Sequence, residues 1–447
     1  MNALEQDSRS RIALAIFALA IGSFAIGTTE FVTMGVLPEI SQGLGVDEPT
    51  AAHGITSYAL GVVVGVPVLT ILGARLPRKA FLIGLMAAYS LFNLLTAFVD
   101  SYEVFVLVRF LDGFPHGAYF GLASLAAANM VPPIRRGRAV ASVIMGLSVA
   151  NIIGVPSASW LGQHLGWRAS YVACALLAAA AAAMVAVFLK RQPATHEGRG
   201  TGAAKRFFSS AQVWITLAAG SVGFGGMFAI YSYVATTVTS ISGLSSSVVP
   251  IFLLAFGLGM TLGTWIGGEL AAWSVYKSLL FASMGTVCVM FLFWVSSPYG
   301  WFAIVGLFGV STVSSITVTN LQLRLMDVAG DASTLGAAMS HAVLNIGNAV
   351  GAAAGGAVIA AGYSYRAPAL VAVGLAFIGL LIISASGLLE RKTGNRGSAA
   401  VAADEARAAR AAEAEAKSDG AVAPAADDAA AVGDVEASDT SAGAHIR

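Results

Sequence analysis

VRFLDGFPHGAYFG, from Val108 to Gly121, places three ionisable side chains inside an otherwise apolar run. Arg109, Asp112 and His116 are spaced by three and then four residues, so on a helix they line one face and can satisfy one another. Ionisable groups inside a membrane are costly and commonly mark a substrate or ion path. A structural Arg–Asp pair that locks helix packing is the alternative. The stretch therefore favours a functional site on a buried membrane helix.

Three glycines of the same stretch, Gly113, Gly117 and Gly121, recur at every fourth residue. On a helix they form a stripe of small residues, which lets a neighbouring helix approach closely. This pattern predicts that the stretch packs inside a bundle of helices.

The chain as a whole is strongly apolar, since 57% of its 447 residues are hydrophobic and only 11% are charged. This composition excludes one or two soluble domains and predicts an all-α, polytopic membrane protein. The two cysteines lie in separate apolar runs, which indicates neither a disulfide framework nor a metal site. Phosphate-binding and metallohydrolase motifs are absent from the sequence, so no ATPase, enzyme or cofactor is expected in this chain.

Twelve stretches reach the length of about 20 residues that a membrane-spanning helix needs. The first is too long for a signal peptide and carries Glu30, so we expect it to be retained. The stretches predict two six-helix bundles, over 12–189 and 211–389, with spans at 12–36, 51–72, 80–99, 104–130, 139–162, 167–189, 211–237, 249–272, 278–296, 300–323, 334–361 and 367–389.

Lysine and arginine are concentrated in alternate loops, and such loops face the cytoplasm. The basic loops include 75–79, 135–138 and 190–206, whereas the opposite loops carry acids such as Glu39, Asp47 and Glu48. The pattern predicts that residues 1–11, the linker 190–210 and the C-terminus are all cytoplasmic.

The fifth and eleventh stretches resemble each other. Asn151 and Gly154 in the fifth are matched by Asn348 and Gly351 in the eleventh, and a glycine followed by an arginine comes after each. Because the two stretches hold equivalent places in the two halves, the match predicts a parallel repeat.

The end of the chain has a different composition. Residues 390–447 become rich in alanine, aspartate and glutamate, with almost no large apolar side chains beyond Ser398. Such a segment cannot bury a core, so we expect a disordered, acidic cytoplasmic tail.

Three motifs resemble the major facilitator superfamily, and within it the bacterial drug:proton antiporter branch of arabinose-efflux-like and chloramphenicol-exporter-like permeases. They are GTTEFVTMGVLPEI (Gly27–Ile40), RFLDGFPHGAYFG (Arg109–Gly121) and SVANIIGVPSASWLGQHLGWR (Ser148–Arg168). The loop GARLPRK, from Gly73 to Lys79, keeps the glycine and bases of the family's loop motif but lacks its aspartate. The resemblance implies alternating access between two bundles in a bacterial cytoplasmic membrane.

Glu30 lies deep in the first span, where a desolvated carboxylate near a cation can change its charge as its surroundings change. The resemblance implies that it carries the coupling proton, together with Arg109, Asp112 and His116. Arg109 cannot lose its charge, so it is expected to tune an acid, either Glu30 on another helix or Asp112 on its own. Asp112 that only neutralises Arg109, and His116 as a structural hydrogen-bonding group, are the alternatives.

A second group of residues consists of aromatic and methionine side chains in the first helices of the two halves, together with polar side chains of the first, fifth and eleventh helices. Such a lining suits amphipathic organic compounds, because apolar surface with few polar anchors gives broad selectivity. Lipid-facing or packing roles are the alternative. The predicted substrate-cavity residues are Thr28, Phe31, Met34, Asn151, Met227, Tyr231, His341 and Asn345.

A third group is expected to take part in gating. Pro156 should bend the fifth helix, and glycines on that helix should give a thin surface for packing against the other half. The predicted gating residues are Gly73, Arg78, Gly146, Gly154 and Pro156.

The sequence thus predicts a proton-coupled secondary transporter that exports drug-like or amphipathic small molecules, and it is not expected to be an enzyme. Efflux of sugars or metabolites is the alternative. The expected partners are a small-molecule substrate, protons and the lipid bilayer, with no nucleic acid, no ATPase subunit and no metal.

Overall fold

The computed structural model describes residues 3–73, 76–132, 136–191, 207–330 and 333–393, and every regular element within them is helical. Most of the basic linker and the tail beyond Thr393 lie outside the described residues, so the predicted disorder of the tail lies outside them too. The last helix continues to Thr393, past the expected border at residue 389.

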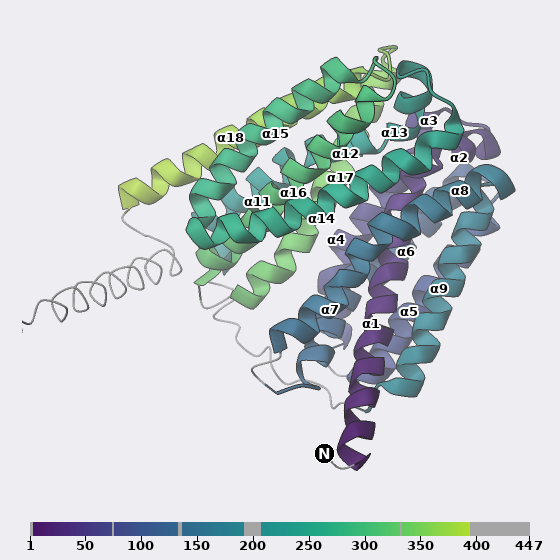
Figure 1. Cartoon of the computed structure of the whole chain (residues 1–447), viewed down its shortest axis with the longest axis vertical. Helices are drawn as coiled ribbons and strands as arrows, with labels where there is room; N and C mark the ends of the chain where they lie inside the picture. The colour runs from purple at the N-terminus through teal and green to yellow at the C-terminus, as the bar shows by residue number, and fades with distance from the viewer. Residues whose placement is uncertain (1–2, 74–75, 133–135, 192–206, 331–332, 394–447) are drawn as a thin grey trace, which may run out of the picture. The chain divides into compact units, whose positions relative to one another are not determined.

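The first half of the chain forms six long helices with short elements between the first two. These elements are α1 (Ala3–Gly35), α2 (Leu37–Leu44), α3 (Glu48–Ala51), α4 (His53–Gly73), α5 (Arg78–Ala97), α6 (Tyr102–Ala128), α7 (Arg136–Val149), η2 (Ala150–Gly154), α8 (Val155–Leu165) and α9 (Trp167–Phe188). The tracts α7, η2 and α8 together form the fifth span. Figure 1 shows this half in purple to blue.

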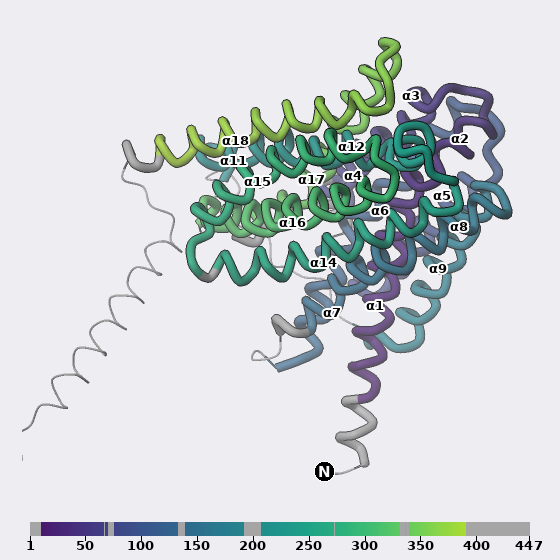
Figure 2. Tube along the Cα trace, turned by 45° about the horizontal axis from the view of Figure 1, so that its top comes forward, coloured from purple at the N-terminus to yellow at the C-terminus, as the bar shows by residue number. Residues whose placement is uncertain are grey.

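The second half, drawn in green to yellow in Figures 1 and 2, repeats the six long helices. Its first span is interrupted after Gly223 and again after Tyr231. Its elements are α11 (Ala211–Gly223), α12 (Gly225–Tyr231), α13 (Val234–Thr236), η3 (Thr237–Ile241), η4 (Ser246–Val248), α14 (Val249–Trp273), α15 (Val275–Ser296), α16 (Phe302–Ala329), α17 (Ser333–Ala360) and α18 (Ala367–Thr393).

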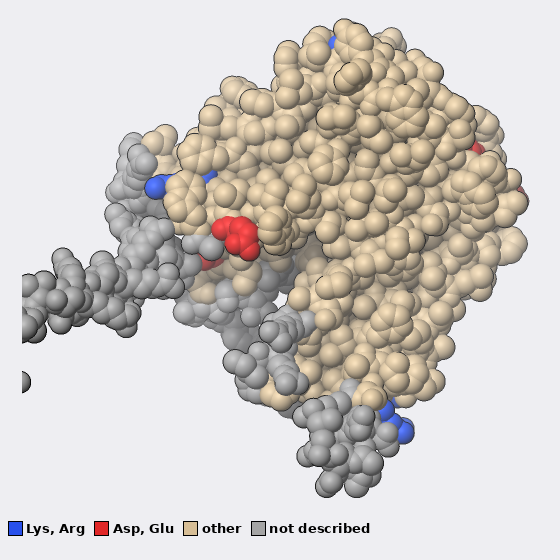
Figure 3. Space-filling view, in the orientation of Figure 1, with Lys and Arg blue, Asp and Glu red and all other residues tan. Residues whose placement is uncertain are grey.

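All twelve expected spans are helical. Among the described residues, ten helices are long and apolar enough to cross a membrane, judged by length and composition alone. The other two expected spans are α4 and α6, and the ionisable groups of α6 make it less apolar. Figure 3 shows a broad face that is almost free of charged side chains. Large apolar side chains such as Leu107, Trp160 and Phe291 are exposed, as expected for contact with lipid tails.

The parallel repeat is visible where the fifth and eleventh spans end. Gly166 and Gly362 adopt φ angles of 88° and 89°, a left-handed conformation that favours glycine. Just beyond them, Arg168 donates to Val99 O and Arg366 donates to Trp294 O, each at 2.8 Å. The two arginines thus tether equivalent helix ends in the two halves.

The fifth span changes its winding at the predicted bend. Residues Ala150–Gly154 form a π-helical turn in which the Val155 N–H donates to Ala150 O, five residues earlier. Pro156 follows at once and has no N–H to donate. The bulge and the proline together interrupt the regular α-helical ladder at this point.

Close helix packing follows glycines on both sides of the α4–α6 contact. A Cβ added at Gly61 would overlap the backbone of Phe110, and one added at Gly113 would overlap the backbone of Tyr58. Gly117 faces Val66, but nothing lies within 4 Å of a Cβ at Gly121. The predicted stripe is therefore confirmed for its first two glycines and wrong for Gly121, where a Cβ would meet open space.

The glycines of the fifth span do not face the other half, contrary to the prediction. Gly146 packs on Ala20 and Gly154 packs on Thr28, both of α1 in the same half. The close approach to the other half is made by Gly257 of α14, against the backbone of Asn151. The sequence showed the small residues on the fifth span but not the rotation of the helix, which turns them toward α1.

The most extensive contacts between the two halves are made by two helices of the second half, α17 and α14. The second-half helix α17 packs on α4 and α3, and α14 packs on α8 and η2. The segment from α2 to α3 and the end of α12 lie at the same end of the bundle (Figure 1), which is called here the α3 end.

Candidate functional site

The site is built on α6, whose 27 residues carry Arg109, Asp112 and His116 on one buried face. All three side chains are nearly inaccessible, with relative exposures of 0%, 0% and 2%. Pro115 lies within the helix and removes one backbone donor, which loosens the helix next to His116. The predicted clustering of these residues on one face is confirmed. Arg109 and Asp112 pair with each other, whereas His116 bonds to Tyr58 on another helix.

Arg109 is paired with Asp112 on its own helix. The Arg109 Nη1 to Asp112 Oδ2 distance is 2.6 Å, and the second carboxylate oxygen accepts from Asn93 Nδ2 at 2.9 Å. Of the two acids proposed as partners of Arg109, the structure thus joins it to Asp112. A buried pair in this geometry neutralises both charges and satisfies the carboxylate.

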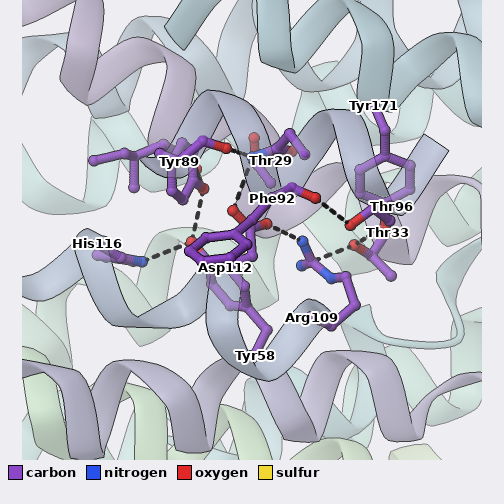
Figure 4. A network of polar contacts seen from close by, with 12 residues as sticks. Thr29, Thr33, Tyr58, Tyr89, Phe92, Thr96, Arg109, Asp112, His116 and Tyr171 are labelled. Carbon is purple, nitrogen blue, oxygen red and sulfur yellow. Dashed lines mark hydrogen bonds and ion pairs between the residues drawn. The ribbon is translucent and has the colours of Figure 1, made fainter. Parts of the chain in front are cut away.

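The remaining guanidinium surface of Arg109 is covered by α1, α4 and α9. Its Nη2 donates to Thr33 Oγ1 at 3.3 Å, and that hydroxyl shares a hydrogen bond of 2.8 Å with Tyr171 Oη. The guanidinium carbon lies 4.3 Å from the ring centroid of Tyr58 (Figure 4). Arg109 therefore holds several helices of the first half together.

His116 starts a chain of hydrogen bonds that leads away from the ion pair. Its Nδ1 lies 2.9 Å from Tyr58 Oη, which lies 2.8 Å from Tyr89 Oη, and Tyr89 donates to Ile26 O at 3.3 Å (Figure 4). A histidine hydrogen-bonded on one nitrogen keeps the other free to exchange a proton.

Glu30 of α1 lies near the other ring nitrogen of His116, on the side of the ring away from Tyr58. Glu30 Oε2 is 4.0 Å from His116 Nε2, and Glu30 has a relative exposure of 8%. The arrangement brings a carboxyl group and an imidazole to within one small movement of a direct hydrogen bond, which is what proton exchange between them requires. Among the described residues, no three acidic, histidine or cysteine side chains are grouped to hold a metal ion.

The sequence did not point to Tyr58, Tyr89, Asn93 or Tyr171, which complete this network. One signal was present, because Tyr89 and Asn93 lie four residues apart in an apolar span and so share a face of α5. Isolated tyrosines in membrane spans are otherwise common at interfaces, which is why they carried no prediction.

The aromatic and methionine residues predicted to line a cavity form a packed cluster instead. Phe31 stacks on Phe228 at 6.1 Å between centroids and meets Tyr231 edge-on at 5.8 Å. Met34 and Met227 have no exposed surface and lie in the same cluster. Residues of both halves thus come together as expected, but here they are closed on one another.

The polar members of the predicted cavity group differ in how they are satisfied. Thr28 donates to Phe24 O at 2.8 Å within its helix. Asn151 and Asn345 each donate to a carbonyl of their own helix at 3.0 Å, while their amide oxygens are buried without a hydrogen-bond partner. Asn348 is buried with both amide atoms unpartnered. Buried unsatisfied amides are rare, and they suit a site that a ligand completes.

His341 of α17 connects the second half to the network. Its ring stacks on Phe120 of α6 at 5.6 Å with an interplanar angle of 10°, and the Phe120 ring also lies 5.4 Å from the His116 ring. Phe120 thus contacts one imidazole from each half.

The gating residues at the loop after α4 lie outside this network. Gly73 is the last residue of α4 and Arg78 is the first of α5, and residues 74–75 between them lie outside the described part. Arg78 is 7% exposed, which is unusual for an arginine at a helix start.

Comparison with known proteins places these features in one family. A sequence profile described as Major Facilitator Superfamily matches residues 19–340. The Inner membrane transport protein YdhP of Escherichia coli (strain K12) is 37% identical over 387 residues, covering 86% of this chain and 98% of that protein. The Chloramphenicol resistance protein of Streptomyces lividans is 29% identical over 353 residues, covering 76% and 87%.

A similar fold occurs among solved structures. The crystal structure of a D-xylose-proton symporter matches with a TM-score of 0.69 at 12% identity, over 83% of this chain and 97% of that one. At this identity the match concerns the fold alone. It agrees with the two six-helix bundles inferred from the sequence.

Proposed function

The chain belongs to the major facilitator superfamily, and from that premise we propose that it is a proton-coupled secondary transporter exporting drug-like or amphipathic small molecules by alternating access. The membrane helices, the superfamily and the resemblance to efflux proteins support this proposal. The observation that carries the coupling is the buried carboxyl of Glu30, 4.0 Å from His116 and next to a separately neutralised ion pair.

Glu30 is proposed as the group that carries the proton. Asp112 already balances the charge of Arg109, so an ionised Glu30 would add a negative charge to a site of very low exposure. Binding a proton removes that charge, and access to water on the other side of the membrane favours its release. His116 can pass the proton, because its second nitrogen is held by Tyr58.

Arg109 and Asp112 are proposed to position the site. The pair fixes α6 against α1, α4 and α5 through Thr33, Tyr58 and Asn93. This rigid frame sets the distance between Glu30 and His116, on which proton exchange depends.

The substrate is proposed to bind where the two halves meet in the middle of the membrane. The cluster of Phe31, Met34, Met227 and Tyr231 contains both rigid aromatic rings and adaptable methionines. When the halves separate, these side chains would offer an apolar surface to an amphipathic compound. The name of the Streptomyces relative, a chloramphenicol resistance protein, agrees with this substrate class.

Efflux of a sugar or another hydroxyl-rich metabolite is the second candidate. It is favoured by the unpartnered amide atoms of Asn151, Asn345 and Asn348, since amides hydrogen-bond readily to hydroxyl groups. A substrate panel should therefore include both lipophilic cations and neutral sugars.

The topology proposed from the loop charges places the α3 end outside the cell. The halves contact one another at this end through α3, α17 and the end of the seventh span. On this topology, the structure corresponds to a conformation closed to the outside. The gating role proposed for Pro156 and the π turn is to let the fifth span change its bend as α14 moves past Asn151.

Transport driven by a pH gradient tests the proposal. Purified protein in vesicles of known orientation should drive the uptake of a panel compound when a proton gradient is imposed. Glu30→Gln should retain substrate binding but lose the response to the gradient, because an amide cannot change its charge. Glu269→Gln, an exposed carboxylate on α14, is the matched control. A gradient response in Glu30→Gln equal to that of the unchanged protein would rule out Glu30 as the coupling group.

A further inference from the structure

A second carboxyl, that of the partly buried Glu48, lies between the two halves at the α3 end. The short helix α3 begins after Asp47, whose carboxylate accepts the Thr50 N–H at 3.0 Å and so caps it. The cap and Pro49 in the first turn fix the direction of the Glu48 side chain. Its carboxylate accepts a hydrogen bond from Thr236 Oγ1, which belongs to the other half of the chain.

The opposing surface is held in place by the break in the seventh span. After α12 ends at Tyr231, the chain turns, and Tyr233 Oη donates to Ala352 O of α17 at 3.0 Å. A Cβ added at Gly356 of α17 would overlap the Tyr233 hydroxyl and lie 3.7 Å from Pro49. The outer gate is defined here as Glu48, Pro49, Tyr233, Thr236 and Gly356, where α3 packs against α13 and α17.

We propose that Glu48 is a second proton-binding site of the transport cycle, which takes a proton from the outer side as the gate closes around it. The inference rests on the proposed function for its direction, since it uses the same topology and the same proton gradient. It concerns a different carboxyl from Glu30, on different elements and between the halves rather than within one.

The surroundings of Glu48 favour a neutral side chain when the gate is closed. Glu39 of α2 faces it with a buried Oε2 that has no hydrogen-bond partner, and Tyr233 and Tyr365 face it from the second half. Asp47 lies beside it on α3, with His53 beyond. Burial, followed by repulsion from Glu39, raises the pKa of Glu48, while the hydroxyls of Thr236 and Tyr365 act in the opposite direction.

The hydrogen bond to Thr236 survives a change of protonation. A threonine hydroxyl donates to a carboxylate and can accept from a carboxylic acid, so the contact across the gate remains in both states. Protonation therefore removes the cost of a partly buried charge without breaking the contact.

The sign of the pH effect follows from the raised pKa. A closed gate binds the proton more tightly than an open gate, in which Glu48 faces water near its ordinary pKa. By linkage, acid at the outer face stabilises the closed gate, and this stabilisation is lost as the pH rises through the closed-state pKa. After release of an exported compound outside, proton binding would thus favour closing and the return of the carrier.

A distance measurement across the gate tests this directly. Spin labels at Gln42→Cys and Ser246→Cys, both exposed and on opposite halves, report the gate in lipid nanodiscs. Cys288 is exposed and is changed to serine, whereas Cys174 is buried and stays. Pulsed dipolar spectroscopy gives the ratio of short to long distances between pH 4 and 8.

The short-distance population should increase as the pH falls, and Glu48→Gln should abolish this dependence and keep the gate closed. The ratio should change by up to about tenfold for each unit between the closed-state and open-state pKa values. Thr236→Val should move the midpoint to higher pH, because it removes a donor to the carboxylate. Glu103→Gln, an exposed carboxylate in the first turn of α6, should leave the curve unchanged.

A Glu48→Gln curve that matches that of the unchanged protein would overturn the proposal. Repeating the measurement in Glu30→Gln separates the two carboxyls, because the gate should still respond to pH there. If the gate responds through Glu48 while vesicles show no proton-driven transport, the site stands and the proposed function fails. If transport is proton-driven but the pH response of the gate is unchanged in Glu48→Gln, the proposed function stands and the Glu48 site fails.

Discussion

Replacing Arg109 with methionine should be among the most destabilising single changes in the first half. Methionine keeps much of the volume and is apolar, so the main effect is the loss of the buried charge. Asp112 would then lie with 0% exposure and only the amide of Asn93 as a partner. Removing one partner of a buried ion pair costs about 3–5 kcal/mol.

Two smaller effects change this loss, one increasing it and one limiting it. The guanidinium lies 4.3 Å from the ring centroid of Tyr58, and a desolvated cation–π contact contributes about 1–2 kcal/mol. Protonation of the stranded Asp112 would limit the loss, since a neutral acid is less costly to bury than an ion. We therefore expect a decrease of roughly 4–6 kcal/mol in the free energy of unfolding.

The double variant Arg109→Met/Asp112→Leu distinguishes the cost of an unpaired buried charge from the cost of losing the other contacts of the pair. With both charges gone, the remaining cost is the Asn93 amide, which still donates to Tyr89 O at 2.9 Å. An amide that loses one of two partners costs about 1–3 kcal/mol. The double variant should therefore be more stable than the Arg109→Met single variant, by about 2 kcal/mol or more.

Reversible unfolding in mixed detergent micelles can measure these differences. Asp100→Asn provides the control, because it removes only the 2.8 Å solvent-exposed pair with Arg168 and leaves the bond from Arg168 to Val99 O in place. The exposed pair should be worth no more than about 1 kcal/mol. The reasoning would be refuted if Arg109→Met were as mild as the control, or if the double variant were no more stable than the single one.

Three further predictions follow from the packing and the loop charges. Gly61→Leu should destabilise the first half by about 1–3 kcal/mol or more, because the backbone of α6 occupies that space, whereas Gly121→Leu should be tolerated in the same unfolding assay. Pro156→Leu should slow the exchange of cysteine accessibility between the two membrane sides while substrate affinity remains, and a loss of affinity with normal exchange would contradict the gating role. A reporter fused after Ser210 should be cytoplasmic and one inserted within 40–50 should be outside, and the opposite pattern would overturn the topology.

The helices could be predicted from the sequence because hydropathy acts locally. A run of about 20 apolar residues must become a helix in a bilayer whatever its neighbours are, since its backbone groups have no other partners. The polar stretch around Arg109 could be found in the same way, because charges inside such a run stand out without any knowledge of contacts. The repeat also needed only the sequence, and the matching conformations of Gly166 and Gly362 agree with it.

Partners, by contrast, depend on how each helix is rotated and packed. By chemistry alone, either Glu30 or Asp112 could pair with Arg109. The packing of α1 against α6 places Asp112 beside Arg109 and Glu30 beside His116. The glycines of the fifth span were visible in the sequence, but only the rotation of the helix turned Gly154 toward α1.

The contact between Glu48 and Thr236 joins residues 188 positions apart and carries no local signal. Each lies in an irregular segment, one in a four-residue helix and the other beside a π turn. Hydropathy determines that such segments lie at the ends of the spans. Which of their polar groups meet is decided by the packing of one half on the other, because a hydrogen bond needs both groups within about 3 Å and correctly oriented.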